Sequence, residues 1–185
     1  MQKLQIGINE AGQRLDKYLH KLLPNAQNSF LYKMMRKKNI VLNGKKAEGS
    51  ARLEAGDCVT LYFSDETFKK FSSDKTFVPE LRSDAESALS LEVMYEDQDI
   101  LIINKPSGLL SQKAVSTDYS ANEQIIQYLL EKGSITQQTL KTFRPSVCNR
   151  LDRNTSGILI AGKTLYGLQN MSRQLKDRTI SKYYR

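Results

Sequence analysis

One stretch without regular apolar spacing constrains the fold most, because it separates two parts of the chain that each have such spacing. Residues 64–90, SDETFKKFSSDKTFVPELRSDAESALS, are rich in serine and in charges of both signs. This composition is typical of a linker, although Phe68, Phe71 and Phe77 offer side chains that can dock on a neighbour. We therefore predict two domains, residues 1–63 and 91–185, joined by a linker over residues 64–90.

The first domain has the pattern of two helices followed by a small curled sheet. In RLDKYLHKLLP, residues 14–24, the apolar side chains fall on one helical face. Residues 29–38, SFLYKMMRKK, predict a second helix, with Ser29 as its N-cap. A short strand, IVL, then enters an Asn43-Gly44 hairpin turn. LEAGDCVTLYF, residues 53–63, alternates as a strand does.

The second domain mixes strands and helices. Strands are predicted by LEVMYE, ILIIN and GILIAGK, and helices by ANEQIIQYLLEKG and LYGLQNMSRQLKD. TISKYYR, residues 179–185, predicts the start of a further strand. The fold class is therefore α+β, with a mixed or antiparallel sheet in the second domain that looks unfinished at Arg185.

Charge and cysteine content narrow the functional classes. The chain has 28 Lys and Arg against 20 Asp and Glu, a net charge of +8 that favours a polyanionic partner. Cys58 and Cys148 lie far apart and His20 is the only histidine, so a zinc site and Cys-His or Ser-His catalysis lack residues. No apolar run has the length of a membrane span, and the N-terminus has no signal-peptide core. We expect a cytoplasmic protein whose chemistry uses carboxylates and arginines.

Basic side chains gather on the second predicted helix and the hairpin after it: Lys33, Arg36, Lys37, Lys38, Lys45 and Lys46. A solvated helix face explains them about as well as RNA binding does. Their clustering on one small unit, with Tyr32 nearby for base stacking, favours RNA. In the order of their elements, residues 13–63 resemble an S4 RNA-binding domain. The resemblance implies RNA contact through the second helix and the adjoining loop.

The motif NRLDRNTSG, residues 149–157, places one carboxylate, Asp152, between Arg150 and Arg153 just before a strand. An ion-paired surface loop is one interpretation. In the other, the two arginines keep Asp152 ionised for chemistry on RNA, and Arg150 stacks on, or replaces, an extruded base. The spacing of the residues leaves both interpretations open.

Together with YEDQDILIINKPSGLL before it, this motif resembles the RluA-type pseudouridine synthases, in which an S4-like domain, a linker and this pattern follow one another. The resemblance implies that Asp152 is the catalytic aspartate and that Arg150 helps to flip the target uridine. It also implies that a tyrosine of the final KYY, Tyr184 ahead of Tyr183, lies against the base. Two basic side chains are then further RNA contacts: Arg153 and Lys182.

The chain departs from the family pattern in two places. Asn149 stands where the more common motif has histidine, which is not the nucleophile, and an amide can still form hydrogen bonds. The family catalytic domain is also longer than residues 91–185, so we expect a truncated chain and do not predict that it is active by itself. Lys105-Pro106 and Gly108 match the family strand-end motif. They predict either a strand end and turn, or a phosphate or loop contact near the cleft.

These observations predict the isomerisation of specific uridines to pseudouridine in structured RNA, with large-subunit ribosomal RNA favoured and transfer RNA possible. The reaction breaks the N1–C1′ bond and rejoins the uracil through C5, so we expect no cofactor and no metal. Asp152 acts as nucleophile or as base, and the sequence leaves the choice open. The alternative is a non-catalytic S4-type RNA-binding or ribosome-assembly protein. The sequence predicts no oligomeric state.

Overall fold

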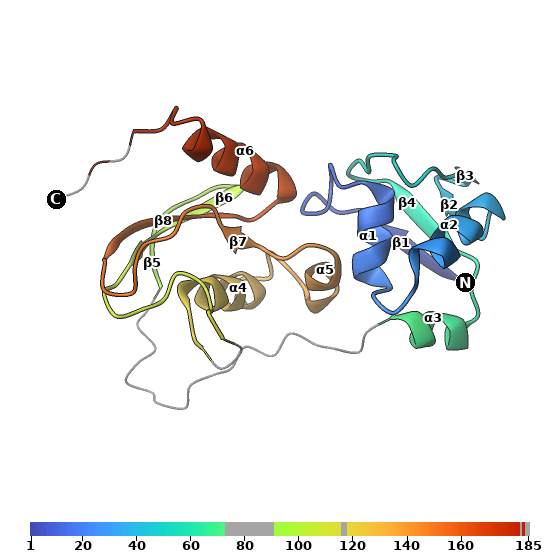
Figure 1. Ribbon diagram of the computed structural model, residues 1–185, viewed down its shortest axis with the longest axis horizontal. Coiled ribbons are helices and arrows are strands. Elements are labelled where there is room, and N and C mark those ends of the chain that lie inside the picture. The colour runs from blue at the N-terminus through green and yellow to red at the C-terminus, as the bar shows by residue number, and fades with distance from the viewer. Residues whose placement is uncertain (73–90, 116–117, 182, 184–185) are drawn as a thin grey trace. The chain divides into compact units, whose positions relative to one another are not determined.

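The computed structural model describes residues 1–72, 91–115, 118–181 and 183. The chain forms two compact units, each with its own sheet (Figure 1). Unit 1 comprises Met1–Thr76 and Gln137–Phe143, and unit 2 comprises Phe77–Thr136 and Arg144–Arg185. Both sheets have four strands, and every strand pair in them is antiparallel. The predicted α+β class is confirmed.

Unit 1 orders its strands β1-β4-β2-β3. The strands are β1 (Gln2–Gln5), β2 (Ile40–Leu42), β3 (Lys45–Lys46) and β4 (Cys58–Leu61). The helices are α1 (Leu15–Leu22), α2 (Asn28–Arg36), α3 (Asp65–Phe71) and α5 (Gln137–Thr142). Apolar faces of α1 and α2 join the inner side of the sheet in one buried cluster, which includes Leu15, Leu19, Leu31, Ile40 and Leu61.

Two local features of unit 1 follow from particular residues. Asn43 and Gly44 have φ of 51° and 73°, the left-handed pair that a two-residue hairpin turn requires, so the predicted turn is confirmed. The predicted N-cap of the second helix is wrong, because α2 already begins at Asn28. The Phe30 and Leu31 N–H groups both donate to the Gln27 carbonyl, which starts the helical bonding before Ser29.

A helix, α3, lies inside the segment predicted as a linker. The Ser64 hydroxyl accepts a hydrogen bond from the Thr67 N–H at 3.2 Å and so caps the helix. Phe68 and Phe71 pack against the core of unit 1, and the Phe71 ring centroid lies 4.5 Å from that of Phe30. Unit 1 therefore continues past residue 63, and residues 73–90, with Phe77, lie outside the described residues.

Unit 2 orders its strands β5-β6-β8-β7. The strands are β5 (Glu92–Glu96), β6 (Ile100–Lys105), β7 (Ser146–Val147) and β8 (Gly157–Gly162). The helices are α4 (Ala121–Glu131) and α6 (Leu165–Lys176), which lie on opposite faces of the sheet (Figure 1). Alternation along β6 buries Leu101, Ile103 and Lys105, so the carboxyl end of this strand reaches into the interior.

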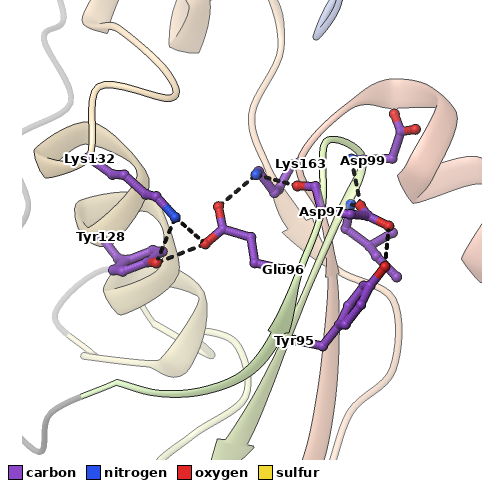
Figure 2. A network of polar contacts seen from close by, with 8 residues as sticks. Tyr95, Glu96, Asp97, Asp99, Tyr128, Lys132 and Lys163 are labelled. Carbon is purple, nitrogen blue, oxygen red and sulfur yellow. Dashed lines mark hydrogen bonds and ion pairs between the residues drawn. The ribbon is translucent and has the colours of Figure 1, made fainter.

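A charged network joins the layers of unit 2. Figure 2 shows the Glu96 carboxylate, at the end of β5, between Lys132 after α4 and Lys163 after β8. The lysine ammonium groups donate at 2.6 and 2.7 Å, and the Tyr128 hydroxyl donates at 2.8 Å. Burial alone would raise the pKa of Glu96, but these hydrogen bonds outweigh it and lower the pKa to about 2. The network thus fastens α4 and the start of α6 to the sheet.

The strand predicted over residues 179–185 is not formed by the part of this segment that the structure describes. Thr179–Ser181 and Tyr183 have no strand conformation, and they pair with no residue of the described ladders. A strand is stable only where its N–H and C=O groups find a partner, so local β propensity alone does not form one here. Lys182, Tyr184 and Arg185 lie outside the described residues.

Candidate active site

The candidate site is the loop between β7 and β8, with Asp152 exposed on it. The loop leaves the sheet at Cys148, whose N–H donates to the Ile160 carbonyl at 2.6 Å. The side-chain amide of Asn149 then forms hydrogen bonds with the backbone of β8. Its Nδ2 donates to the Ile158 carbonyl at 3.0 Å, and its Oδ1 accepts from the Ile160 N–H at 2.9 Å. The predicted hydrogen-bonding capacity of Asn149 is used to anchor the start of the loop.

A second loop, residues 106–111 after β6, is bonded to the residues around Asp152. The Ser111 hydroxyl donates to the Leu151 carbonyl at 2.8 Å and accepts from the Leu151 N–H at 3.0 Å. The Gly108 N–H donates to the Arg153 carbonyl at 2.8 Å, and the Ser107 hydroxyl to the Asn154 carbonyl at 2.8 Å. The backbone on both sides of Asp152 is therefore fixed to a second segment.

Lys105 lies beneath both loops as a fully buried cation. Its Nζ donates to three carbonyl groups, those of Pro106 at 2.9 Å, Leu109 at 2.7 Å and Arg153 at 3.2 Å. Burial lowers the pKa of Lys105. The strand end and turn predicted from the strand-end motif are observed, because β6 ends at Lys105 and a turn follows at residues 107–108. The ammonium group also ties the Asp152 loop to the 106–111 loop.

The arginines that flank Asp152 do not pair with it in the structure. Arg153 donates from Nε to the Gly108 carbonyl at 3.1 Å, and Arg150 is exposed. Within the described ranges, no ion pair includes Asp152. The ion-paired surface loop is therefore not observed, and neither is close contact of both guanidinium groups with the carboxylate. Hydrogen bonds to the backbone N–H and C=O groups of the loop hold it in place instead.

A hollow of about 100 Å³ adjoins the Asp152 loop. It is lined by Gly108, Leu109, Leu110, Asp118, Tyr119 and Arg153. Hydrogen bonds from the Val115 and Ala114 N–H groups lower the pKa of Asp118, and the charge of Arg153 acts in the same direction. The sequence analysis did not single out Asp118 or Tyr119. Their only signal is a polar turn directly before α4.

The other predicted site residues are exposed or lie outside the described residues. Tyr183 is 91% exposed, whereas Tyr184 and Lys182 lie outside the described residues. The basic side chains of unit 1 are all exposed: Lys33 and Arg36 on α2, Lys37 and Lys38 after it, and Lys45 and Lys46 on β3. Each unit thus carries one group of the predicted residues.

Neither a metal-ligand cluster nor a membrane helix is found in the described part of the chain. No three His, Cys, Asp or Glu side chains come together there as metal ligands would. No described helix has both the length and the apolar composition needed to cross a bilayer. The two cysteines are free thiols, and burial raises the pKa of Cys148.

Two solved structures match parts of the chain at low similarity. Human RNA pseudouridylate synthase domain containing 4 matches 48% of this chain and 30% of its own, with a TM-score of 0.38 and 17% identity. A crystal structure of a pseudouridylate synthase matches 90% of this chain and 53% of its own, with a TM-score of 0.29 and 18% identity. The fold class of this chain rests on its own two antiparallel sheets.

Sequence comparison finds relatives that match nearly the whole chain. Ribosomal large subunit pseudouridine synthase C of Vibrio cholerae serotype O1 is 29% identical over 100% of this chain and 54% of its own length. Ribosomal large subunit pseudouridine synthase D of Neisseria meningitidis serogroup B is 30% identical over 98% of this chain and 44% of its own. The chain spans about half the length of the curated relatives that it matches. Residues 99–185, which contain the Asp152 loop, match the RNA pseudouridylate synthase family.

Proposed function

We propose that the protein isomerises specific uridines to pseudouridine in structured RNA, with large-subunit ribosomal RNA as the favoured substrate and transfer RNA as the second candidate. One observation carries the proposal: Asp152 is exposed on a loop whose neighbouring residues, Leu151 and Arg153, are bonded to the 106–111 loop. A carboxylate held this way can meet a substrate without first ordering its loop. The family similarity over residues 99–185 supports the same reaction.

The roles proposed for the site residues follow the chemistry of the reaction. The N1–C1′ bond breaks, C5 takes the place of N1 on the sugar, the C5 proton leaves and N1 gains a proton. Asp152 serves as nucleophile or as base, and Arg150 stacks on, or replaces, the extruded base. Tyr184 lies against the uracil ring, while Arg153 and Lys182 contact the RNA backbone. Residues 91–185 carry this catalytic portion.

Unit 1 supplies RNA binding in this proposal. We assign residues 1–63, two helices and a small sheet, to an S4-type domain. Its exposed cations would contact phosphates, which position an RNA but do not read its sequence: Lys33, Arg36, Lys37, Lys38, Lys45 and Lys46. A cytoplasmic location, where ribosomal RNA is found in bacteria, fits this substrate.

The Asp152→Ala variant of the intact protein tests the proposal. We expect tritium release from RNA that contains 5-tritiated uridine to fall by at least about a hundredfold, because the reaction loses its only proposed acid–base or nucleophilic group. RNA affinity should stay within about twofold of the parent, since the carboxylate is not a phosphate-binding group.

The exposed Asp177, at the C-terminal end of α6, provides a matched control. Asp177→Ala should leave tritium release unchanged. Turnover near the parent rate in Asp152→Ala would remove Asp152 from its proposed role. An intact parent protein that binds RNA but releases no tritium from any ribosomal or transfer RNA would instead support the non-catalytic alternative.

A further inference from the structure

Unit 1 contains a hollow of about 330 Å³ between α2 and the chain that follows β3. We call it the Tyr32 hollow. Its charged lining residues are Arg14, Arg36, Lys46 and Glu48, and Tyr32 and Gly49 also line it. Three cations against one carboxylate make the lining positive. The volume lies at the small end of the range of roughly 300–1,000 Å³ that small-molecule pockets occupy. It has room for one nucleotide and none for a duplex.

The Tyr32 ring in this hollow is both exposed and fixed in place. The side chain is 42% exposed, and its hydroxyl donates to Asp16 Oδ2 at 3.0 Å. A Cβ at Gly49 would lie 2.9 Å from the ring, so a glycine is needed for the backbone to pass this close. An aromatic face held open in this way is a platform on which a base can stack at little cost in conformational entropy.

The Asp16 carboxylate that accepts the hydrogen bond from the Tyr32 hydroxyl is held in place by other hydrogen bonds. Burial alone would raise the pKa of Asp16, but hydrogen bonds from Arg14, Tyr32 and the Lys17 N–H outweigh it and lower the pKa. Arg14 donates to both carboxylate oxygens, at 3.2 and 2.7 Å. The Asp16 N–H donates to the Gly49 carbonyl at 2.9 Å, which fixes the wall of the hollow to the start of α1.

Only some of the basic side chains of unit 1 reach the hollow. Arg36 and Lys46 line it, whereas their neighbours Lys37 and Lys45 do not. Successive residues of a strand point to opposite faces, which separates Lys46 from Lys45 on β3. Within the described residues, Arg36 and Lys46 form no ion pair, so both are available to an anionic ligand.

We propose that the Tyr32 hollow binds one unpaired RNA nucleotide, with its base on the Tyr32 ring and its phosphate between Arg36 and Lys46. This inference rests on the proposed function only in taking RNA as the ligand. A base inside an A-form helix has no free face, so the site selects loops, bulges and single strands. A simple basic surface would instead attract duplex and single strand through all its cations alike.

The test compares binding of a labelled single-stranded RNA of about ten nucleotides with binding of a duplex of the same length, using the whole protein. Tyr32→Leu should weaken single-strand binding by on the order of tenfold and change duplex binding by less than about twofold. Tyr32→Phe keeps the ring and should lose much less. Equal losses for both RNAs, or no loss for the single strand, would overturn the proposal.

Lys46→Ala and Lys45→Ala form a matched pair, because both side chains are exposed on β3 and neither substitution removes a buried group. Lys46→Ala should weaken single-strand binding more than duplex binding, and Lys45→Ala should weaken both equally. Indistinguishable behaviour of the two variants would refute the nucleotide site. Tritium release is measured separately on the same proteins. A parent that releases no tritium but keeps the Tyr32 and Lys46 contrasts would refute the proposed reaction and leave the nucleotide site standing.

Discussion

Lys105 is a buried cation, and its partners among the described residues are three carbonyl groups. Removing an ammonium group from water is unfavourable, and the lowered pKa of Lys105 reflects this burial. The three hydrogen bonds offset that effect and connect chain segments 48 residues apart. Burying the Lys105 ammonium group is unfavourable, and its hydrogen bonds hold the loop around Asp152 in place.

Lys105→Met should lower the free energy of unfolding by about 2–4 kcal/mol, because the apolar stem is retained but the part-buried carbonyls of Pro106, Leu109 and Arg153 each lose the hydrogen bond from the ammonium group. Urea denaturation of the variant and the parent measures the loss. Lys176→Met, on the exposed end of α6, is the control and should change stability by less than about 1 kcal/mol. Equal losses in the two variants would show that the carbonyl contacts of Lys105 contribute nothing.

Helix α6 approaches the sheet of unit 2 through two glycines. A Cβ at Gly162 would lie 2.4 Å from the Leu168 Cα, and one at Gly167 would lie 2.2 Å from the Asp99 carbonyl oxygen. The Thr164 hydroxyl caps the helix by accepting from the Gly167 N–H at 3.0 Å, and it donates to Asp99. The close packing of this element therefore requires the absence of two side chains.

Gly167→Ala should destabilise the protein by about 1–3 kcal/mol, because the added methyl group must displace α6 from Asp99. The sign of the change in the free energy of unfolding tests the close approach of α6 to Asp99. At an exposed helix position, alanine would instead stabilise the protein by about 1 kcal/mol relative to glycine. Urea denaturation gives the difference, with Gln169→Ala on the exposed side of the same helix expected to stay within about 0.5 kcal/mol of the parent. A gain in stability for Gly167→Ala would contradict the close approach.

Regular elements were predictable where a strong apolar period extends over several turns, as in α1, α4 and α6. Several of the short elements were not. β1 has only four residues, and α5 is a six-residue helix with little apolar character. α3 lies in a serine-rich charged stretch, and only Phe68 and Phe71 signalled that it docks. Such elements form because of their tertiary contacts, which a local pattern does not contain.

The same limit applies to the candidate site at the scale of the whole molecule. The motif around Asp152 was evident in the sequence, but the bonds that fix it join residues 40 to 48 positions apart. The positions of Asp118 and Tyr119 depend on how the 106–111 loop returns to α4. The sequence predicts domains over residues 1–63 and 91–185, and it gave no sign that Gln137–Phe143 belongs to unit 1.

Acid should weaken unit 2 through Glu96. Its folded pKa of about 2 lies below the ordinary value of 4.5, so its contribution to stability is complete above pH 4.5 and is lost as the pH falls from there towards 2. Glu96→Gln should be less stable than the parent by about 1.5–3 kcal/mol at neutral pH, and this difference should vanish near pH 2.

Urea midpoints of the two proteins between pH 2 and 7 check this expectation. Glu131→Gln at the exposed end of α4 is the control, because among the described residues its side chain bonds to Gln127 on the helix surface and not to the sheet. A difference between Glu96→Gln and the parent that stays constant over this range would show that the charge of Glu96 does not stabilise the fold.

Asn149 holds the base of the Asp152 loop to β8 through two hydrogen bonds that do not depend on pH. These bonds require the side chain to donate to the Ile158 carbonyl and to accept from the Ile160 N–H at the same time. An amide presents both at every pH, whereas an imidazole, with an unperturbed pKa of about 6.5, turns its acceptor into a second donor on protonation. With asparagine at this position, mild acidification leaves the loop attached to β8.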